Sequence, residues 1–308
     1  MKIKIGIIGA SLRAMTIVNN LVATNSNVEF IIIDNAHEIA EAHISDFEDI
    51  LGLKSNILSI KHSDYRELKD TNILIIDAKT RFFPGMSFKD IAIENSEIIY
   101  QIAYQVRKND FNGLAFILTE PNSLMCQVFE QVSGLISHKI IGIGTLMETM
   151  RFNNLLAKKI ENFNYDAYAV GDTNQSFLAL QDLLLKYTNF SSSLIEIEKV
   201  TYDINTKSED IKMLKKHYNW ASAFVISKII KNIIEEKNTS FVLNVKNKEV
   251  DYLKNSYFSL PTKLTLDGVK EINMLNFSNK EIQQINSLNK HNEDLMSMIL
   301  KHFGNKGI

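Results

Sequence analysis

The first half of the chain alternates short, nearly uninterrupted apolar runs with segments of helical periodicity. The runs are KIKIGII at 2–8, VEFIIID at 28–34, NILIIDA at 72–78, GLAFILTE at 113–120 and HKIIGIG at 138–144. Predicted helices lie between them, over residues 10–24, 36–51, 87–108 and 122–133. Strands that are apolar on both faces are covered by helices on both faces, so this order predicts parallel strands joined by crossover helices. The expected fold class is α/β with a doubly wound parallel sheet.

Beyond about residue 145 the pattern changes to mixed helices and antiparallel strands. Helices are predicted over 146–162, over 208–237 as one long or kinked element, and over 278–303; strands are predicted at 196–204, 241–245 and 257–269. No proline-rich linker separates the halves, so we expect them to pack tightly. The expected organisation is a dinucleotide-type domain over 1–145 followed by an α+β domain over 146–308.

Charge and cysteine content exclude several function classes. The 34 basic and 36 acidic residues are interspersed and give a formal net charge of −2, so no net field attracts nucleic acid or an anionic membrane. The single cysteine, Cys126, forms no intrachain disulfide, which favours a reducing compartment. The N-terminus is typical of a strand and not of a signal peptide. We therefore expect a soluble, cytoplasmic protein with a metabolic or protein partner and no metal site.

The turn after the first strand resembles a dinucleotide-binding turn. In the G-x-G-x-x-G pattern the glycines provide the tight bend, the close approach of the pyrophosphate and the close helix packing. Gly9, Ser11 and Ala14 hold these places, and Asp34 ends the second strand where a carboxylate can hydrogen-bond a ribose. Three interpretations stay open: an NAD site, a domain that has lost its nucleotide, or a site for another nucleotide that uses Ser11 and Arg13.

Several longer segments carry a family likeness over nearly the whole chain. They are GIIGAS at 6–11, Asp34, PGMSFKDI at 84–91, Asn95, TEPNS at 119–123, VSGLISHKIIGIGTLMETMRF at 132–152, AYAVGD at 167–172 and LPTKLTLDGVKEI at 260–272. On these segments the chain resembles the lactate and malate dehydrogenase superfamily, most closely its L-2-hydroxyisocaproate dehydrogenase-like branch. The resemblance implies a Rossmann domain followed by an α+β catalytic domain.

The resemblance also implies a chemistry, the reduction of a small 2-oxo acid to a 2-hydroxy acid with NADH. It implies NAD as cofactor and a homodimer or homotetramer. The cofactor-binding residues it implies are Gly9, Ser11, Leu12, Asp34 and Thr119. The reaction needs a histidine that donates a proton, an aspartate that orients it, an arginine that binds the substrate carboxylate and a loop arginine that polarises the carbonyl.

Most of these catalytic positions have changed. Thr173 stands at the position of the proton-donating histidine, Glu148 at that of the orienting aspartate, and Phe88 at that of the loop arginine. Glu120 replaces the neutral amide of the Thr-Asn-Pro turn and would repel a carboxylate. Arg151 matches the carboxylate-binding arginine, and it is expected either to capture an anion or to form a structural ion pair with Glu120 or Glu148.

These replacements predict a lactate/malate dehydrogenase-like protein that is impaired or inactive in 2-oxo acid reduction. A threonine hydroxyl has no useful pKa near neutrality, and a phenyl ring cannot polarise a carbonyl. The alternative is an active NAD-dependent oxidoreductase with a rearranged site. His217, in the bulky segment KHYNW at 216–220, is the one histidine with a position suited to a relocated acid, and Lys89 follows Phe88.

Overall fold

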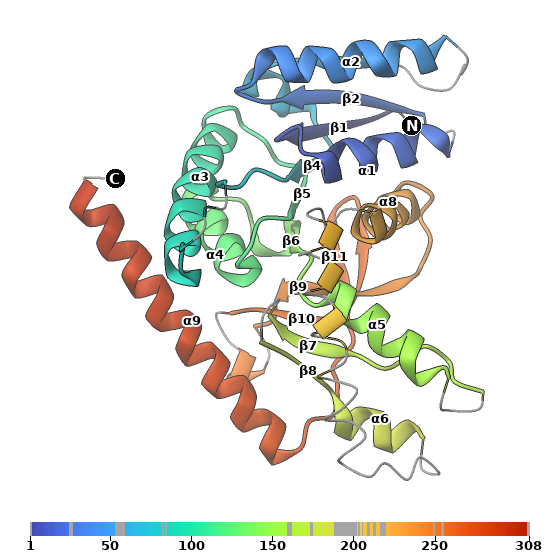
Figure 1. The fold of residues 1–308 in the computed structure, drawn as a ribbon, viewed down its shortest axis with the longest axis vertical. Coiled ribbons are helices and arrows are strands. Elements are labelled where there is room, and N and C mark those ends of the chain that lie inside the picture. The colour runs from blue at the N-terminus through green and yellow to red at the C-terminus, as the bar shows by residue number, and fades with distance from the viewer. Residues whose placement is uncertain are drawn as a thin grey trace.

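The computed structural model describes most of the chain. The described residues are 2–24, 27–52, 59–81, 83, 85–158, 162–172, 175–187, 202, 204, 206–207, 210–211, 214–215, 220–248, 250–253 and 256–306. In this part of the chain a nine-stranded sheet has the order β11-β10-β9-β6-β5-β4-β1-β2-β3, and β7 and β8 form a separate two-stranded sheet. Figure 1 shows the large sheet running through the molecule with helices on both sides.

The N-terminal half has the predicted parallel architecture. Its elements are β1 (Ile3–Ile8), α1 (Leu12–Ala23), β2 (Val28–Ile33), α2 (His37–Leu51), β3 (Ser59–His62), η1 (Tyr65–Asp70), β4 (Ile73–Ile76), α3 (Phe88–Lys108), β5 (Leu114–Ile117), α4 (Asn122–Ser133), η2 (Ser137–Lys139) and β6 (Ile140–Gly142). All pairings among β1 to β6 are parallel, and β1 lies between β2 and β4. From β1 the strand order proceeds to β2 and β3 on one side and to β4, β5 and β6 on the other. In this class of sheet the crevice that binds ligands lies at such a reversal of strand order, here between the carboxyl ends of β1 and β4.

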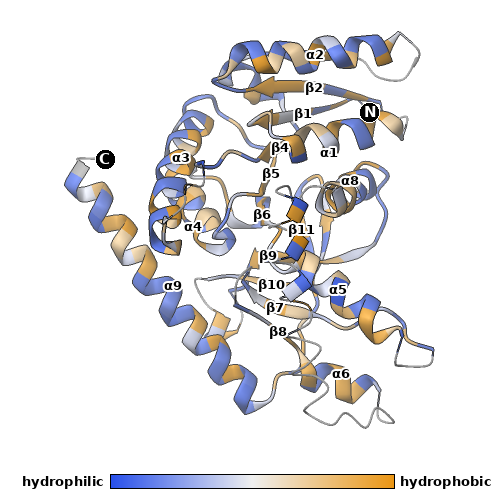
Figure 2. Ribbon diagram, in the orientation of Figure 1, coloured by the Kyte–Doolittle hydropathy of each residue, from blue (hydrophilic) through white to orange (hydrophobic). Residues whose placement is uncertain are grey.

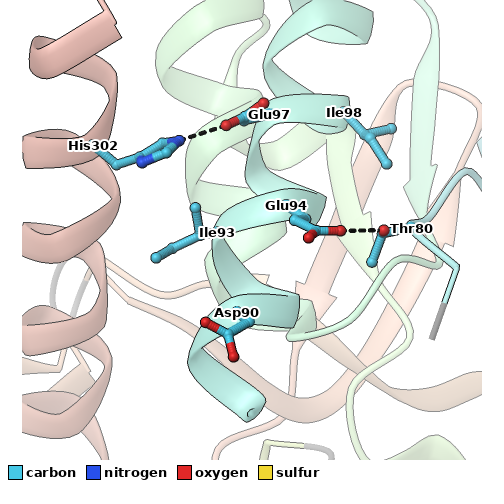
Figure 3. A pocket seen from close by; sticks show the side chains of 7 residues that line it. All are labelled: Thr80, Asp90, Ile93, Glu94, Glu97, Ile98 and His302. Atoms are coloured by element: carbon cyan, nitrogen blue, oxygen red, sulfur yellow. Dashed lines mark hydrogen bonds and ion pairs between the residues drawn. The ribbon is translucent and has the colours of Figure 1, made fainter. Parts of the chain in front are cut away.

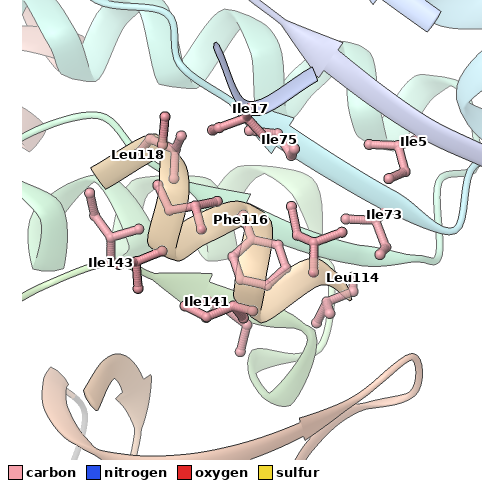
Figure 4. Close-up of a cluster of buried hydrophobic side chains, with 14 of the residues drawn as sticks. Ile5, Ile17, Ile73, Ile75, Leu114, Phe116, Leu118, Ile141 and Ile143 are labelled. Atoms are coloured by element: carbon pink, nitrogen blue, oxygen red, sulfur yellow. The ribbon is translucent and has the colours of Figure 1, made fainter. Parts of the chain in front are cut away.

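Apolar side chains of the strands form the core on both faces of the sheet. Ile5, Ile75 and Phe116 have no exposed surface, and Ile17 of α1 packs with them (Figure 4). The strands β1 and β2 are almost wholly hydrophobic, whereas the helices that cover them alternate in hydropathy (Figure 2). Burial of this kind contributes about 25 cal/mol per Å² of apolar surface, which explains why the continuous apolar runs become central strands.

The C-terminal half extends the same sheet. Its elements are α5 (Leu146–Leu156), β7 (Ala169–Asp172), β8 (Gln175–Leu178), α6 (Leu180–Lys186), α8 (Trp220–Ile234), β9 (Ser240–Lys246), η3 (Asp251–Leu253), β10 (Tyr257–Thr265), β11 (Gly268–Ile272) and α9 (Asn279–Lys306). Strands β9 to β11 are antiparallel, and β9 joins β6 through one register pair, Gly142 with Asn244. The predicted halves therefore share a sheet, and the boundary at 145/146 stays a prediction.

A buried polar network reinforces that junction. The amide of Asn244 donates to Asn122 Oδ1 at 3.0 Å and to Ser123 Oγ at 3.1 Å, and it accepts from Ser259 Oγ at 2.5 Å. The N–H of Thr145 donates to Ser259 Oγ at 3.0 Å. Because each partner is buried, the network fixes how the chain enters α5.

The fold class is confirmed, and the differences from prediction are local. Helix α5 ends at Leu156, short of residue 162, because the chain turns back and Ala167 exchanges two hydrogen bonds with the Asn153 side chain. Strands β3, β7 and β8 were not predicted. Of the strand predicted at 196–204, only residues 202 and 204 are described, and both are helical, so the prediction is wrong there. Most of residues 208–219 lie outside the described part of the chain. No described helix is both long and apolar enough to cross a bilayer.

Candidate active site

The turn between β1 and α1 brings the backbone to the crevice. Gly9 has a φ of +93°, and a Cβ at this position would lie 2.7 Å from the carbonyl oxygen of Asp77. Glycine is therefore required both by the backbone conformation and by the approach of β4. Among the described residues, the first-turn N–H groups of Leu12 and Arg13 have no hydrogen-bond partner, so they remain available to an anion at the start of α1. The Leu12 side chain is half exposed.

Asp34, at the end of β2, faces this turn. Its carboxylate accepts the N–H of Ala10 at 2.6 Å and the N–H of Ala36 at 2.8 Å. A carboxylate offers about four lone-pair positions, so two remain for ribose hydroxyls. The two backbone hydrogen bonds fix the orientation of the Asp34 carboxylate and leave some of its acceptor positions for a ligand.

Ser11 and Arg13 point into the protein and meet Asp77 at the end of β4. Ser11 Oγ accepts the N–H of Ala14 at 3.1 Å as the N-cap of α1, and it donates to Asp77 Oδ2 at 2.5 Å. Arg13 Nε donates to Asp77 Oδ2 at 2.9 Å, and its Nη2 contacts Asp77 Oδ1 and donates to the carbonyl of Leu118 at 2.9 Å. The side chain of Ser11, which stands at the second glycine position of the turn, is thus directed away from the crevice.

The pKa values of Asp77 and Arg13 are both shifted toward the charged form by this buried ion pair. Burial alone would raise the pKa of Asp77, but Arg13 and Ser11 outweigh it and the pKa is lowered. Burial alone would lower the pKa of Arg13, but Asp77 outweighs it and the pKa is raised. Both groups are charged at neutral pH and cancel each other, so Arg13 offers little net charge to a nucleotide. This geometry disfavours the interpretation that Arg13 selects a different nucleotide.

Together these observations fit an NAD-type dinucleotide. Gly9 provides the bend, the start of α1 provides backbone N–H groups, and Asp34 provides ribose acceptors. The hydroxyl of Ser11, which the sequence placed at the phosphate approach, is turned inward. The crevice has therefore kept the groups that hold the adenosine half of the cofactor.

The turn after β5 carries the next predicted residues. Thr119 is fully buried, and its hydroxyl donates to the carbonyl of Ala78 at 2.7 Å. Glu120 precedes Pro121 through a cis peptide bond. The amide of Asn95, on α3, donates to the carbonyl of Glu120 at 2.6 Å and accepts the N–H of Thr80 at 2.7 Å. Asn95 thus fixes the turns after β4 and β5 relative to each other.

Two oppositely charged side chains one turn apart on helix α5 form an ion pair. Arg151 Nη1 donates to Glu148 Oε1 at 3.2 Å, and each side chain is 8% exposed. Of the alternatives for Arg151, the structure shows the pair with Glu148. Burial lowers the pKa of Arg151, against the attraction of Glu148. Burial raises the pKa of Glu148 to about 7; Glu120 adds to the rise, and Arg151 opposes it.

Glu120 links the two regions electrostatically. Its charge contributes to raising the pKa of Arg13 at the turn and that of Glu148 on α5. Such effects weaken with distance, so the charge of Glu120 is felt both at the dinucleotide turn and at Glu148. The contact between Glu148 and Arg151 is observed, and the role of Glu120 in the site stays a prediction.

Other predicted residues are placed differently or lie outside the described part. Phe88 is the first residue of α3, directly after the N-cap Ser87, which forms a capping box with Asp90, and Phe88 as a residue is 37% exposed. Thr173, which is predicted to stand at the position of the proton-donating histidine, lies outside the described residues, and so does His217. Asp172 immediately precedes Thr173 and is buried, with its carboxylate accepting the N–H of Ser123 at 3.3 Å.

Asp77 is the residue that sequence reasoning missed. It ends the apolar run of β4, and Arg13 interrupts the apolar face of α1. Arg13 and Asp77 carry opposite charges within segments that the hydrophobic pattern marks as buried. Because buried charges are normally paired, this combination could have indicated the ion pair.

A groove of about 610 Å³ lies elsewhere, between α3 and the end of α9 (Figure 3). It is lined by Thr80, Asp90, Ile93, Glu94, Glu97, Ile98 and His302. His302 Nε2 contacts Glu97, and Thr80 contacts Glu94. None of the predicted site residues lines this groove. Within the described ranges, no group of three or more His, Cys, Asp or Glu side chains is arranged to hold a metal ion.

Known proteins with similar sequences are dehydrogenases. The chain is 25% identical over 291 residues to L-lactate dehydrogenase of Mesomycoplasma hyopneumoniae, covering 91% of this chain and 92% of the other. It is 27% identical over 284 residues to L-lactate dehydrogenase of Borrelia hermsii, with 88% of each chain covered. It is also 27% identical over 235 residues to malate dehydrogenase of Chlorobium luteolum, covering 72% and 74%.

Solved structures show the same fold. A lactate dehydrogenase from a Medee basin deep-sea metagenome library superposes with a TM-score of 0.86 at 24% identity, covering 96% of this chain and 99% of the other. A family model described as the NAD-binding domain of lactate/malate dehydrogenase matches residues 3–142. With the glycine turn, Asp34 and the parallel sheet already in place, residues 3–142 carry the NAD-binding domain of the lactate/malate dehydrogenases, and the chain as a whole is similar to these enzymes.

Proposed function

We propose that the protein binds NAD but reduces 2-oxo acids with a strongly impaired rate. The observation that carries this proposal is the buried ion pair between Arg151 and Glu148, with 3.2 Å between Nη1 and Oε1. A guanidinium already paired with an internal carboxylate has less net charge to offer to a substrate carboxylate. The nearby charge of Glu120 further disfavours an anionic ligand.

The remaining replacements act on the chemical step. Phe88 has no charge with which to polarise a carbonyl, and the hydroxyl of Thr173 is not an acid near neutral pH. Loss of the proton donor and loss of the electrostatic stabiliser each cost typically about 10²-fold or more. With both absent, we expect turnover about 10⁴-fold or more below that of a complete site.

The cofactor would supply a hydride when bound. Gly9 and the start of α1 would hold its pyrophosphate, and Asp34 would accept hydrogen bonds from its ribose. Thr119 and Asn95 would keep the turns after β4 and β5 in place beside it.

A second candidate is an active oxidoreductase with a rearranged site. It is favoured by Glu148, because its pKa of about 7 lies in the range that suits a general acid. In that case the carboxyl of Glu148 would give its proton to the carbonyl oxygen as the hydride reaches the carbonyl carbon. A 2-oxo acid would then become a 2-hydroxy acid and leave Glu148 ionised.

Two measurements test the proposal. NADH binding is followed by fluorescence titration, with Asp34→Ala as the control that removes the ribose acceptors. NADH oxidation is then followed with a panel of 2-oxo acids. We expect saturable binding that weakens in Asp34→Ala, and no oxidation above the buffer rate. Rapid turnover of any 2-oxo acid would refute impairment and favour the second candidate, and absent NADH binding would refute both.

The proposal includes the setting in which the protein acts. We infer a cytoplasmic homodimer or homotetramer with domains over 1–145 and 146–308, closest to the L-2-hydroxyisocaproate dehydrogenase-like branch. Its small-molecule ligand would be a 2-oxo or 2-hydroxy acid. Light scattering coupled to size-exclusion chromatography measures the mass of the assembly, and a monomeric mass would contradict this part.

A further inference from the structure

Two histidines lie side by side at the outer edge of the parallel sheet. His62 ends β3, the edge strand, and His37 begins α2, the helix that follows β2. Nδ1 of His37 and Nε2 of His62 are 3.2 Å apart, and the two ring centroids are 4.9 Å apart. His37 is exposed, whereas the side chain of His62 is only 14% exposed, so solvent reaches the pair from the side of His37.

A carboxylate on α2 sets the orientation of the His62 ring. Nδ1 of His62 lies 3.0 Å from Oε1 of Glu41, one helical turn after His37. An ionised carboxylate only accepts hydrogen bonds, so Nδ1 carries the proton and donates, and Nε2 of the neutral ring presents its lone pair to His37. Histidines that bind metal ions in proteins almost always donate their other N–H in this way, which fixes the ring and raises the basicity of the ligating nitrogen.

The distances between the two rings fit a shared metal ion. A zinc ion lies about 2.0–2.1 Å from an imidazole nitrogen, and an angle of about 100° at the ion would place the two nitrogens about 3.1 Å apart and the ring centroids about 4.9 Å apart. The observed separations are 3.2 Å and 4.9 Å. Nδ1 of His37 offers its lone pair once its proton has moved to Nε2, a change of tautomer that releases no net proton.

We propose that His37 and His62 bind one late first-row transition-metal ion, such as Zn²⁺, Ni²⁺ or Cu²⁺, with Glu41 as the residue that positions His62. Imidazole nitrogens favour these ions, whereas Mg²⁺ and Ca²⁺ take oxygen ligands. Two side chains leave coordination positions open, and water fills them. The bound ion links the start of α2 to the end of β3, and it uses none of the residues assigned to NAD, so the inference is independent of the proposed function.

Titration calorimetry with Zn²⁺, Cu²⁺ and Mg²⁺ tests this on the full chain without an affinity tag, after treatment with EDTA and dialysis. We expect one ion per chain, tighter binding of Cu²⁺ than of Zn²⁺, and no binding of Mg²⁺. Saturating Zn²⁺ should also raise the midpoint of thermal unfolding, because the ion binds the folded chain, and EDTA should reverse the shift.

Variants assign the binding to this pair. His37→Gln and His62→Gln should each lose more affinity than Glu41→Ala, which should weaken binding about tenfold. Glu41→Gln should restore most of that loss, since its amide oxygen still accepts the N–H of His62. His43→Gln, on the same helix, is the matched control and should bind as the native protein does.

Three results would overturn the inference: no saturable binding of Zn²⁺ or Cu²⁺ up to about 1 mM, unchanged binding in His37→Gln and His62→Gln, or an equal loss in His43→Gln. If a variant fails to fold, the native protein decides alone. Electron paramagnetic resonance of the Cu²⁺-loaded chain should show coupling to two imidazole nitrogens, and coordination by oxygen alone would overturn the inference. NADH binding, measured separately, reports on the proposed function without affecting this result.

Discussion

Replacing Arg13 with methionine tests whether the ion pair beneath the dinucleotide turn holds the crevice together. Arg13 contacts both carboxylate oxygens of Asp77 and the carbonyl of Leu118, so three elements meet at one guanidinium. The side chain of Asp77 is 1% exposed, and that of Arg13 is 12% exposed. In Arg13→Met the carboxylate of Asp77 stays buried with the hydroxyl of Ser11 as its remaining side-chain partner.

The expected loss of stability is large because the surviving charge has no access to water. Removing one partner of a buried ion pair costs about 3–5 kcal/mol, whereas replacing both by apolar groups of similar volume is often neutral. We therefore expect Arg13→Met to lower the free energy of unfolding by about 3–5 kcal/mol, and Arg13→Met with Asp77→Leu to recover most of it. The exposed pair of Arg66 and Asp64 gives the control, and Arg66→Met should cause no resolvable change.

Urea unfolding followed by circular dichroism measures these differences, and pH adds a second check. The pKa of Asp77 is lowered in the native protein, so the stabilisation from its ion pair is present above its unfolded pKa of about 3.9 and is lost as pH falls through the folded pKa. The deficit of Arg13→Met should therefore be greatest near neutral pH and shrink in acid. Equal losses in Arg13→Met and Arg66→Met, or a double variant as unstable as the single one, would refute the reasoning.

The contacts above also predict the effects of five further substitutions. Gly9→Ala should lower stability by about 1–3 kcal/mol and weaken NADH binding, since the φ of Gly9 is +93° and the added Cβ would meet the backbone that follows β4. Gly304→Ala, in α9 with open space around it, should raise stability by about 0.5–1 kcal/mol. Burial raises the pKa of Glu148 to about 7, so the contribution of Glu148 to stability is full below pH 4.5 and is lost as pH rises through about 7. Over this range, thermal unfolding should show the native protein losing up to about 3 kcal/mol of stability relative to Glu148→Gln. Glu120→Gln should move the midpoint of that loss to lower pH; an unchanged midpoint would contradict the place given to Glu120. Asn244→Ala should cost about 3 kcal/mol in urea unfolding, because it leaves buried partners unpaired at the junction of β6 and β9.

The parallel half of the fold was predictable because its strands are buried on both faces. A run such as ILII in β4 can only be a central strand once helices cover both sides, and its neighbours follow from the βα order. The short strands β3, β7 and β8 give no such signal. Each is four residues long, and SIKH of β3 and QSFL of β8 contain one buried residue each, so neither carries a clear apolar pattern.

The joining of the two halves into one sheet was not predictable for a different reason. It depends on a single register pair, Gly142 with Asn244, and on a polar network among Asn122, Asn244 and Ser259. Amide and hydroxyl groups in a sequence do not reveal whether they meet each other or water. For the candidate site, the resemblance pointed to Glu148 and Arg151 but left open whether Arg151 pairs with a carboxylate of the chain or binds an anion, and the structure shows the contact with Glu148.

Two guanidinium groups that could have held anions are each neutralised by a carboxylate of the same chain. Arg13 is closed onto Asp77 through two contacts and is nearly insulated from solvent, so its charge is fixed at every pH at which the protein folds. Arg151 Nη1 donates to Glu148 Oε1, and burial raises the pKa of that carboxyl to about 7, so this pair changes its charge near neutral pH. The same residue types therefore give a pair of fixed charge in one place and a pair that titrates in the other. Burial is the main cause of the raised pKa of Glu148, and Glu120 adds to the difference because its charge favours the charged form of Arg13 and disfavours that of Glu148.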